Sequence, residues 1–207
     1  MPHHDLASSE KGLPLRGRTY PKRGGVRPVD EAVVTVEGLS KRYVGKPAVD
    51  DVSFTVRSGE IFGLLGPNGA GKTTTLECLE GIRRADGGRL DVMGLDPSRG
   101  GGRLHHAIGV QLQTSGLPAA MKVGEAIAFF CAYHGVPPRY DLLARLGLED
   151  KRETQYSQLS VGLQRRLALA LALAHRPPVL ILDEPTAGLD VGSRTVLHAL
   201  MGEAQEE

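Results

Sequence analysis

Short apolar runs alternate along the chain with longer stretches that repeat apolar residues at helical spacing. The short runs predict strands at 32–36, 48–56, 60–65, 87–93, 108–112 and 179–182. The longer stretches predict helices at 72–80, 121–134, 141–146, 160–176 and 191–203. Strands that alternate with helices are typical of an α/β domain.

Two of these elements carry more detail than the rest. The run at 60–65 (EIFGLL) is apolar without interruption, which predicts a parallel strand buried on both faces. Ser160 stands directly before the helical stretch that follows it, in the position of an N-cap. A glycine-rich segment separates the strand predicted at 60–65 from the helix predicted at 72–80, so we expect a loop between them.

The first 30 residues differ in composition from the rest. Positions 11 to 28 hold six Lys or Arg and no acidic residue, interleaved with Gly and Pro. This predicts a disordered, solvated basic tail, with contact to acidic lipid headgroups or to a partner as the alternative. The folded domain is expected at 31–207.

Composition narrows the function classes. The formal net charge is +1, with 41% hydrophobic and 24% charged residues, so no general attraction to nucleic acid is expected. Cys78 and Cys131 lie far apart and predict neither a zinc site nor a disulfide. The sequence contains no run of 18 apolar residues, so no membrane span is predicted, and no secretory signal is expected. The pairs His3-His4 and His105-His106 are interpreted as surface histidines, the second pair in a loop.

The segment GPNGAGKT matches the phosphate-binding pattern GxxxxGK[ST]. Glycines let backbone N–H groups turn toward one point, and a helix N-terminus adds partial positive charge. Lys72 supplies a full charge for the β- and γ-phosphates, and Thr73 offers a hydroxyl to Mg²⁺. The sequence therefore predicts a nucleoside triphosphate site formed by Gly66, Pro67, Asn68, Gly69, Ala70, Gly71, Lys72, Thr73 and Thr74.

Two carboxylates follow the apolar strand at 179–182. Ligands of open α/β sheets bind at the carboxyl ends of strands. Asp183 is therefore expected to bind Mg²⁺, and Glu184 to orient or deprotonate the attacking water. Beside a phosphate-binding loop, this pair predicts phosphoryl transfer rather than an ordinary acidic turn.

The most specific pattern is LSVGLQRR, which begins at Leu159 and resembles the LSGGQ signature of ABC ATPases. The order of the phosphate loop, Gln113, this signature, DEP and AGLD resembles the ABC nucleotide-binding domain from about residue 32 onward. The resemblance implies a P-loop α/β fold with a mixed core sheet, an antiparallel β subdomain and a helical subdomain at about 114–165.

The same resemblance implies further roles. Tyr43 matches the aromatic residue that stacks on adenine. Gln113 matches the glutamine that contacts Mg²⁺ and faces the membrane partner, with Gln111 as the alternative. The signature residues Ser160, Gly162 and Gln164 match those that meet the γ-phosphate of ATP held by a second copy. Asp190 matches the residue that bridges the two copies.

Two departures from the family pattern stand out. Val161 replaces the usual glycine of the signature and adds bulk where the partner's phosphate would dock. The family's switch histidine lies on a strand beyond the AGLD segment, and this chain ends 24 residues after Asp183. His198 falls within a predicted helix and is not given that role. We therefore expect a domain incomplete at its C-terminus, with weak or absent ATPase activity on its own.

The leading hypothesis is the ATP-binding subunit of an ABC transporter. The resemblance implies ATP and Mg²⁺ as cofactors, a homodimer of ATPase subunits, a separate transmembrane permease, and a place on the cytoplasmic face of the membrane. The sequence of residues 116–177 resembles that of the ATPase subunits of drug exporters that have separate ATPase and permease chains. The alternatives are an ABC ATPase not coupled to transport and a nucleotide-binding module with little turnover.

Overall fold

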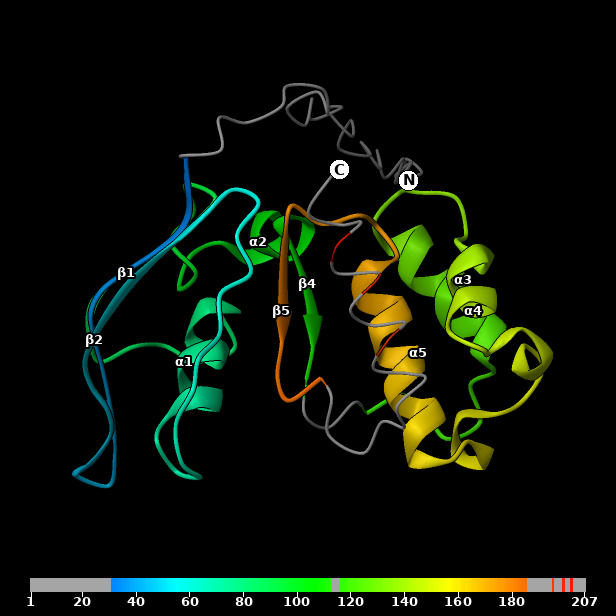
Figure 1. Ribbon diagram of the computed structural model, residues 1–207, viewed down its shortest axis with the longest axis horizontal. Helices are drawn as coiled ribbons and strands as arrows, with labels where there is room; N and C mark the ends of the chain where they lie inside the picture. The colour runs from blue at the N-terminus through cyan, green and yellow to red at the C-terminus, as the bar shows by residue number, and fades with distance from the viewer. Residues whose placement is uncertain (1–30, 113–115, 186–194, 196–198, 200–201, 203–207) are drawn as a thin grey trace, which may run out of the picture.

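The computed structural model describes residues 31–112, 116–185, 195, 199 and 202. It is arranged in three parts that follow one another across the molecule (Figure 1). An antiparallel sheet with helix α1 lies on one side, two parallel strands lie in the middle, and a group of helices lies on the other side. This arrangement places the carboxyl ends of the central strands between two differently built units.

The antiparallel sheet has the order β2-β1-β3. Its strands are β1 (Ala32–Tyr43), β2 (Lys46–Arg57) and β3 (Gly87–Val92). Val44 and Gly45 join β1 to β2, and both have positive φ angles, 46° and 79°. A tight two-residue hairpin turn whose twist matches that of the strands requires a positive φ angle at both of its residues. Helix α1 (Lys72–Leu79) follows the phosphate loop, and its buried Cys78 and Leu79 join the core of this sheet.

The central pair consists of β4 (Ile108–Gln111) and β5 (Val179–Leu182), which run parallel. Their register joins Ile108 to Val179 and Gln111 to Leu182. Helix α2 (Gly101–Ala107) leads into β4. Gly109 lets helix α5 approach closely, because a Cβ at this position would lie 2.2 Å from the carbonyl oxygen of Ala172.

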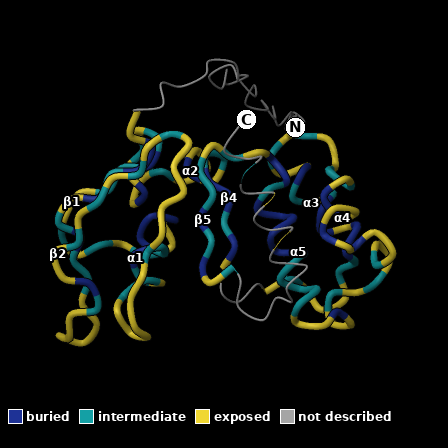
Figure 2. The backbone as a smooth tube through the Cα atoms, viewed as in Figure 1, coloured by how far each residue is buried: buried dark blue, intermediate teal, exposed yellow. Residues whose placement is uncertain are grey.

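The helical part contains α3 (Val123–Tyr133), α4 (Tyr140–Arg145), two single 3₁₀ turns and α5 (Val161–Leu173). The 3₁₀ turns are η1 (Glu149–Lys151) and η2 (Tyr156–Gln158). The side chains of Ile127, Leu143, Leu148 and Leu167 are fully buried in their shared core. Figure 2 shows the buried stretches in α3, α5 and β4. Within the described residues, no helix is long and apolar enough to cross a membrane.

The strand predicted at 60–65 is wrong. These residues form no strand, and Ile61, Phe62 and Leu65 are exposed to 59%, 40% and 95%. A buried strand depends on hydrogen-bonded neighbours, and β4 and β5 pair with one another instead. The segment keeps one aromatic contact, because the Phe62 ring stacks on Phe54 of β2 at 4.8 Å.

The loop predicted around His105 and His106 is also wrong, because both residues belong to α2. Short helices of this kind have little periodicity to reveal them. The remaining expected strands and helices within the described residues are confirmed, with ends that shift by a few residues and with β1 extended to Tyr43. The expected helix at 191–203 lies mostly outside the described residues.

Candidate functional site

The predicted phosphate loop lies between segment 60–65, which has no regular secondary structure, and α1. Gly69 and Gly71 have φ angles of 82° and 85°, in the left-handed region that favours glycine. Space also requires glycine at 71, since a Cβ there would lie 2.3 Å from the carbonyl oxygen of Ala48. Gly71 is the N-cap of α1 and contributes no side-chain hydrogen bond. The amide groups of the first helical turn are thereby left for an anion.

Lys72 closes over this loop. Its Nζ donates hydrogen bonds to the carbonyl oxygens of Gly66 at 2.7 Å and Pro67 at 3.0 Å. The ammonium group is therefore held by carbonyl oxygens of the loop itself, and phosphate oxygens would compete with these two carbonyls for it. Phosphate oxygens carry more charge than carbonyl oxygens, so the exchange favours a bound anion.

Thr73 and Asp183 bring the two predicted catalytic segments together. The Thr73 hydroxyl donates to Oδ2 of Asp183 at 2.9 Å, across 110 residues of sequence. Asp183 is only 7% exposed, and its backbone N–H donates to the carbonyl oxygen of Gln111 at 3.0 Å. The carboxylate is thus fixed at the end of β5.

The oxygen atoms of Thr73 and Asp183 suit a Mg²⁺ ion. Magnesium binds oxygen ligands at about 2.1 Å in octahedral geometry, so neighbouring ligands lie about 3 Å apart. The observed separation of 2.9 Å matches that spacing. A hydroxyl and a carboxylate are also the donor types that magnesium prefers.

Glu184 follows directly and is exposed. Its φ angle of 48° lies in the left-handed region, which an ordinary residue adopts at a cost of about 1–3 kcal/mol. The backbone reversal separates the neighbouring carboxylates, one buried against Thr73 and one accessible to solvent. Glu184 therefore has the accessibility that a base acting on water needs.

The signature segment lies at the start of α5. Ser160 caps this helix as predicted, because its Oγ accepts a hydrogen bond from the N–H of Leu163 at 3.3 Å. Val161 opens the helix and is 64% exposed. Figure 1 shows the starts of α5 and α1 on opposite sides of the β4–β5 pair. One copy of the chain therefore does not bring Ser160 to its own phosphate loop.

Gln164 and Gly162 lie in the first turns of the same helix. The Gln164 side chain faces its own loop, and its Nε2 donates to the carbonyl oxygens of Tyr156 at 3.2 Å and Leu159 at 3.3 Å. In this structure Gln164 holds the turn before the signature rather than reaching outward.

The structure describes two of the five remaining predicted positions. Tyr43 is the last residue of β1, beside the hairpin turn, and is 37% exposed. Gln111 is buried in β4 at 4% exposure. Gln113 and Asp190 lie outside the described residues, as does His198.

Glu80 was missed by the sequence analysis. It is 2% exposed and lines a cavity of about 240 Å³ together with Thr73, Asp183 and Leu112. Burial, and then the charges of Asp183 and Glu77, raise the pKa of Glu80 to about 7. Its position directly after the buried pair Cys78 and Leu79 was the only signal for burial.

A group of histidines was also missed. The rings of His134 and His175 stack 3.6 Å apart with an angle of 3° between their planes. Nδ1 of His134 lies 3.1 Å from Nδ1 of His106. Burial, followed by the nearby His106 and His105, lowers the pKa of His134 from 6.5 to about 4. These residues come from three separate segments, so no local spacing could reveal the group.

Comparison with known proteins identifies the class. Residues 49–187 match the family model described as ABC transporter. A solved structure titled "Structure of ATP binding subunit of ABC transporter" superposes with a TM-score of 0.79 at 26% identity, covering 84% of this chain and 75% of that one. The chain belongs to the ABC transporter family, and its fold is that of the P-loop ABC ATPases.

Curated relatives agree with this assignment. The chain is 41% identical over 171 residues to the Nod factor export ATP-binding protein I of Ralstonia nicotianae, covering 80% of this chain and 53% of that protein. It is 42% identical to the protein of the same name in Paraburkholderia xenovorans, covering 81% and 57%. It is 38% identical to ABC transporter A family member 9 of Dictyostelium discoideum, covering 77% and 20%. The chain thus spans about half the length of the first two relatives.

Proposed function

We propose that this chain binds and hydrolyses ATP as the nucleotide-binding subunit of an ABC exporter. The observation that carries the proposal is the hydrogen bond from Thr73 to Asp183. It joins the helix opened by the phosphate loop to the end of β5, and it forms a paired oxygen site for Mg²⁺ beside the loop. Residues 66–74 hold the triphosphate, and Lys72 neutralises its charge.

The residues proposed to act in hydrolysis lie at the same end of β5. Bound Mg²⁺ would neutralise charge on the β- and γ-phosphate oxygens. Asp183 and Thr73 would hold that ion, with Gln113 as a further ligand. Glu184 accepts a proton from the attacking water or orients it. Its exposure supports this role, since the water must arrive from solvent.

A second copy completes the site. Ser160, Gly162 and Gln164 belong to the signature, and Asp190 to the segment that links two copies. The signature and the phosphate loop lie apart in one chain (Figure 1), so two chains arranged head to tail bring each signature to the partner's phosphates. Val161 is 64% exposed, so it would stand at that contact and limit how closely the two copies approach.

Coupling to a separate transmembrane permease and export across the membrane are proposed from the relatives, two of which are named as export ATP-binding proteins. The subunit would then act at the cytoplasmic face of the membrane. The alternatives are a soluble ABC ATPase without a permease and a nucleotide-binding module with little turnover. Copurification with an apolar membrane protein supports the exporter, whereas copurification with ribosomes supports the first alternative.

Replacement of the base tests the proposed hydrolysis. The Glu184→Gln variant should bind ATP as the unmodified chain does. It should lose at least about 100-fold of the turnover of the unmodified chain, which is itself expected to be weak when the chain acts alone; this is the scale of a lost general base. Glu149→Gln, a change at an exposed glutamate of η1, serves as the matched control and should leave turnover unchanged. Full turnover in Glu184→Gln would show that another group activates the water.

A further inference from the structure

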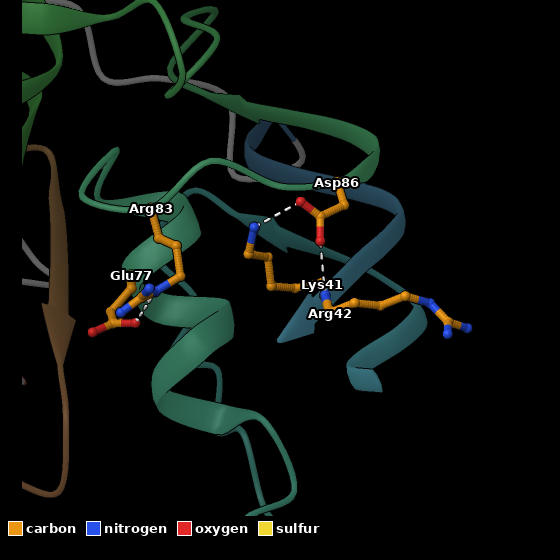
Figure 3. A network of polar contacts seen from close by, with 5 residues as sticks. All are labelled: Lys41, Arg42, Glu77, Arg83 and Asp86. Carbon is orange, nitrogen blue, oxygen red and sulfur yellow. Dashed lines mark hydrogen bonds and ion pairs between the residues drawn. The ribbon is translucent and has the colours of Figure 1, made fainter. Parts of the chain in front are cut away.

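Two ion pairs surround the residue predicted to stack on the base. Nε of Arg83 lies 2.6 Å from Oε2 of Glu77, and Nζ of Lys41 lies 2.7 Å from Oδ1 of Asp86. The other oxygen of Asp86 accepts the backbone N–H of Arg42 at 2.8 Å. Figure 3 shows these contacts bridging α1, the segment after it and β1. The end of β1 is therefore tied to the segment that follows α1, and that segment is in turn tied to α1.

Both cations of these pairs lie against the ring of Tyr43. The guanidinium carbon of Arg83 is 5.1 Å from the ring centroid, and Nζ of Lys41 is 5.8 Å from it. Both distances fall within the range of cation–π attraction. The arginine, with its planar group, is the better suited of the two to lie along an aromatic face.

The position of Arg83 is itself fixed. Its backbone N–H donates to the carbonyl oxygen of Glu77 at 3.0 Å, and its side chain returns to the same residue. Gly81 makes the necessary turn with a φ angle of 74°. A Cβ at Gly81 would lie 2.7 Å from the carbonyl oxygen of Pro97, so this turn depends on glycine.

Tyr43 nevertheless keeps 37% of its surface exposed. We propose that Arg83, anchored by Glu77, is a positioning residue that fixes the ring of Tyr43 so that a purine base stacks on the exposed part of that ring. This inference rests on the proposed function and on the resemblance that matches Tyr43 to the aromatic residue stacking on adenine. It adds a residue pair, Arg83 and Glu77, that affects binding of the base through the ring of Tyr43 and does not affect binding of the triphosphate.

The ligands in the test separate base from phosphate. Binding of ATP and of inorganic tripolyphosphate, each with Mg²⁺, is measured by titration calorimetry for the unmodified chain and for Arg83→Ala, Arg83→Lys and Glu77→Gln. Arg83→Ala should weaken ATP binding about two- to fivefold, the scale of one exposed cation–π contact, and leave tripolyphosphate binding unchanged. Arg83→Lys should recover part of the loss, and Glu77→Gln should show a smaller loss.

Two further variants make the test specific. Arg84→Ala is the matched control, because Arg84 is the neighbouring exposed arginine, and it should bind both ligands normally. In a Tyr43→Ala background, Arg83→Ala should cause no additional loss, since the ring through which it acts is gone.

The outcomes are distinguishable. Equal weakening of ATP and tripolyphosphate by Arg83→Ala, tighter ATP binding, or full additivity with Tyr43→Ala would each overturn the positioning role while leaving the proposed ATP site in place. Failure of the unmodified chain to bind either ligand would instead refute the proposed function, and the role of Arg83 with it.

Discussion

Gly71 offers a sharp test of how the phosphate loop is built, because a matched control lies two residues away. Gly69 and Gly71 have nearly the same φ angle, 82° and 85°. Alanine at either position carries the cost of a left-handed backbone, about 1–2 kcal/mol. The surroundings differ, since a Cβ at Gly69 meets nothing within 4 Å and one at Gly71 would lie 2.3 Å from the Ala48 carbonyl oxygen and 2.9 Å from Val49 Cγ2.

The extra crowding at Gly71 has a predictable magnitude. Overpacking of this kind costs about 1–3 kcal/mol, so Gly71→Ala should destabilise the chain by about 2–5 kcal/mol and Gly69→Ala by about 1–2 kcal/mol. Urea unfolding followed by circular dichroism measures both values. Equal losses for the two variants, or a larger loss for Gly69→Ala, would refute the close packing of the loop against β2.

Three other changes have defined outcomes. Asp183→Asn should weaken ATP binding at least about tenfold with Mg²⁺ present and change it little without Mg²⁺. If the substitution weakened binding equally with and without Mg²⁺, the result would contradict the ion site. Ser160→Ala should lower the free energy of unfolding in urea by about 1 kcal/mol, because the N-cap hydrogen bond is lost. An unchanged free energy of unfolding would show that Ser160 does not stabilise the start of α5. Because the pKa of His134 is lower in the folded chain, the unfolded chain binds its proton first, and stability should fall as pH drops from 6.5 toward 4. His134→Gln should flatten this dependence of the melting temperature, whereas an unchanged slope would assign it to other groups.

The elements of local pattern were predicted well from the sequence. The β-branched run at 32–36 and the apolar run at 179–182 form strands, and Ser160 caps α5, because propensity and capping act over a few residues. The apolar run at 60–65 shows where that reasoning stops. Its composition suits a buried strand, yet burial depends on distant partners that a local pattern does not encode.

The candidate site shows the same division. Thr73 and Asp183 were each identified from local motifs, and the structure adds that they touch. Arg83 and Glu80 belong to no motif, and their positions follow from how α1 ends against β1 and the cavity. Tertiary packing decides which charged residues face a site, so such residues emerge only once the fold is known.

The central claim is that residues 66–73 form a cradle for the phosphates of ATP, and loss of one charge tests it most directly. Titration of ATP with Mg²⁺ should give saturable binding to the unmodified chain, and Lys72→Ala should reduce the affinity by at least about 100-fold. One unit-charge pair at about 4 Å corresponds to about 4 kcal/mol at an effective dielectric constant near 20, which leaves room for compensation by the loop amides. Equal binding by both proteins, or none by the unmodified chain, would contradict the account.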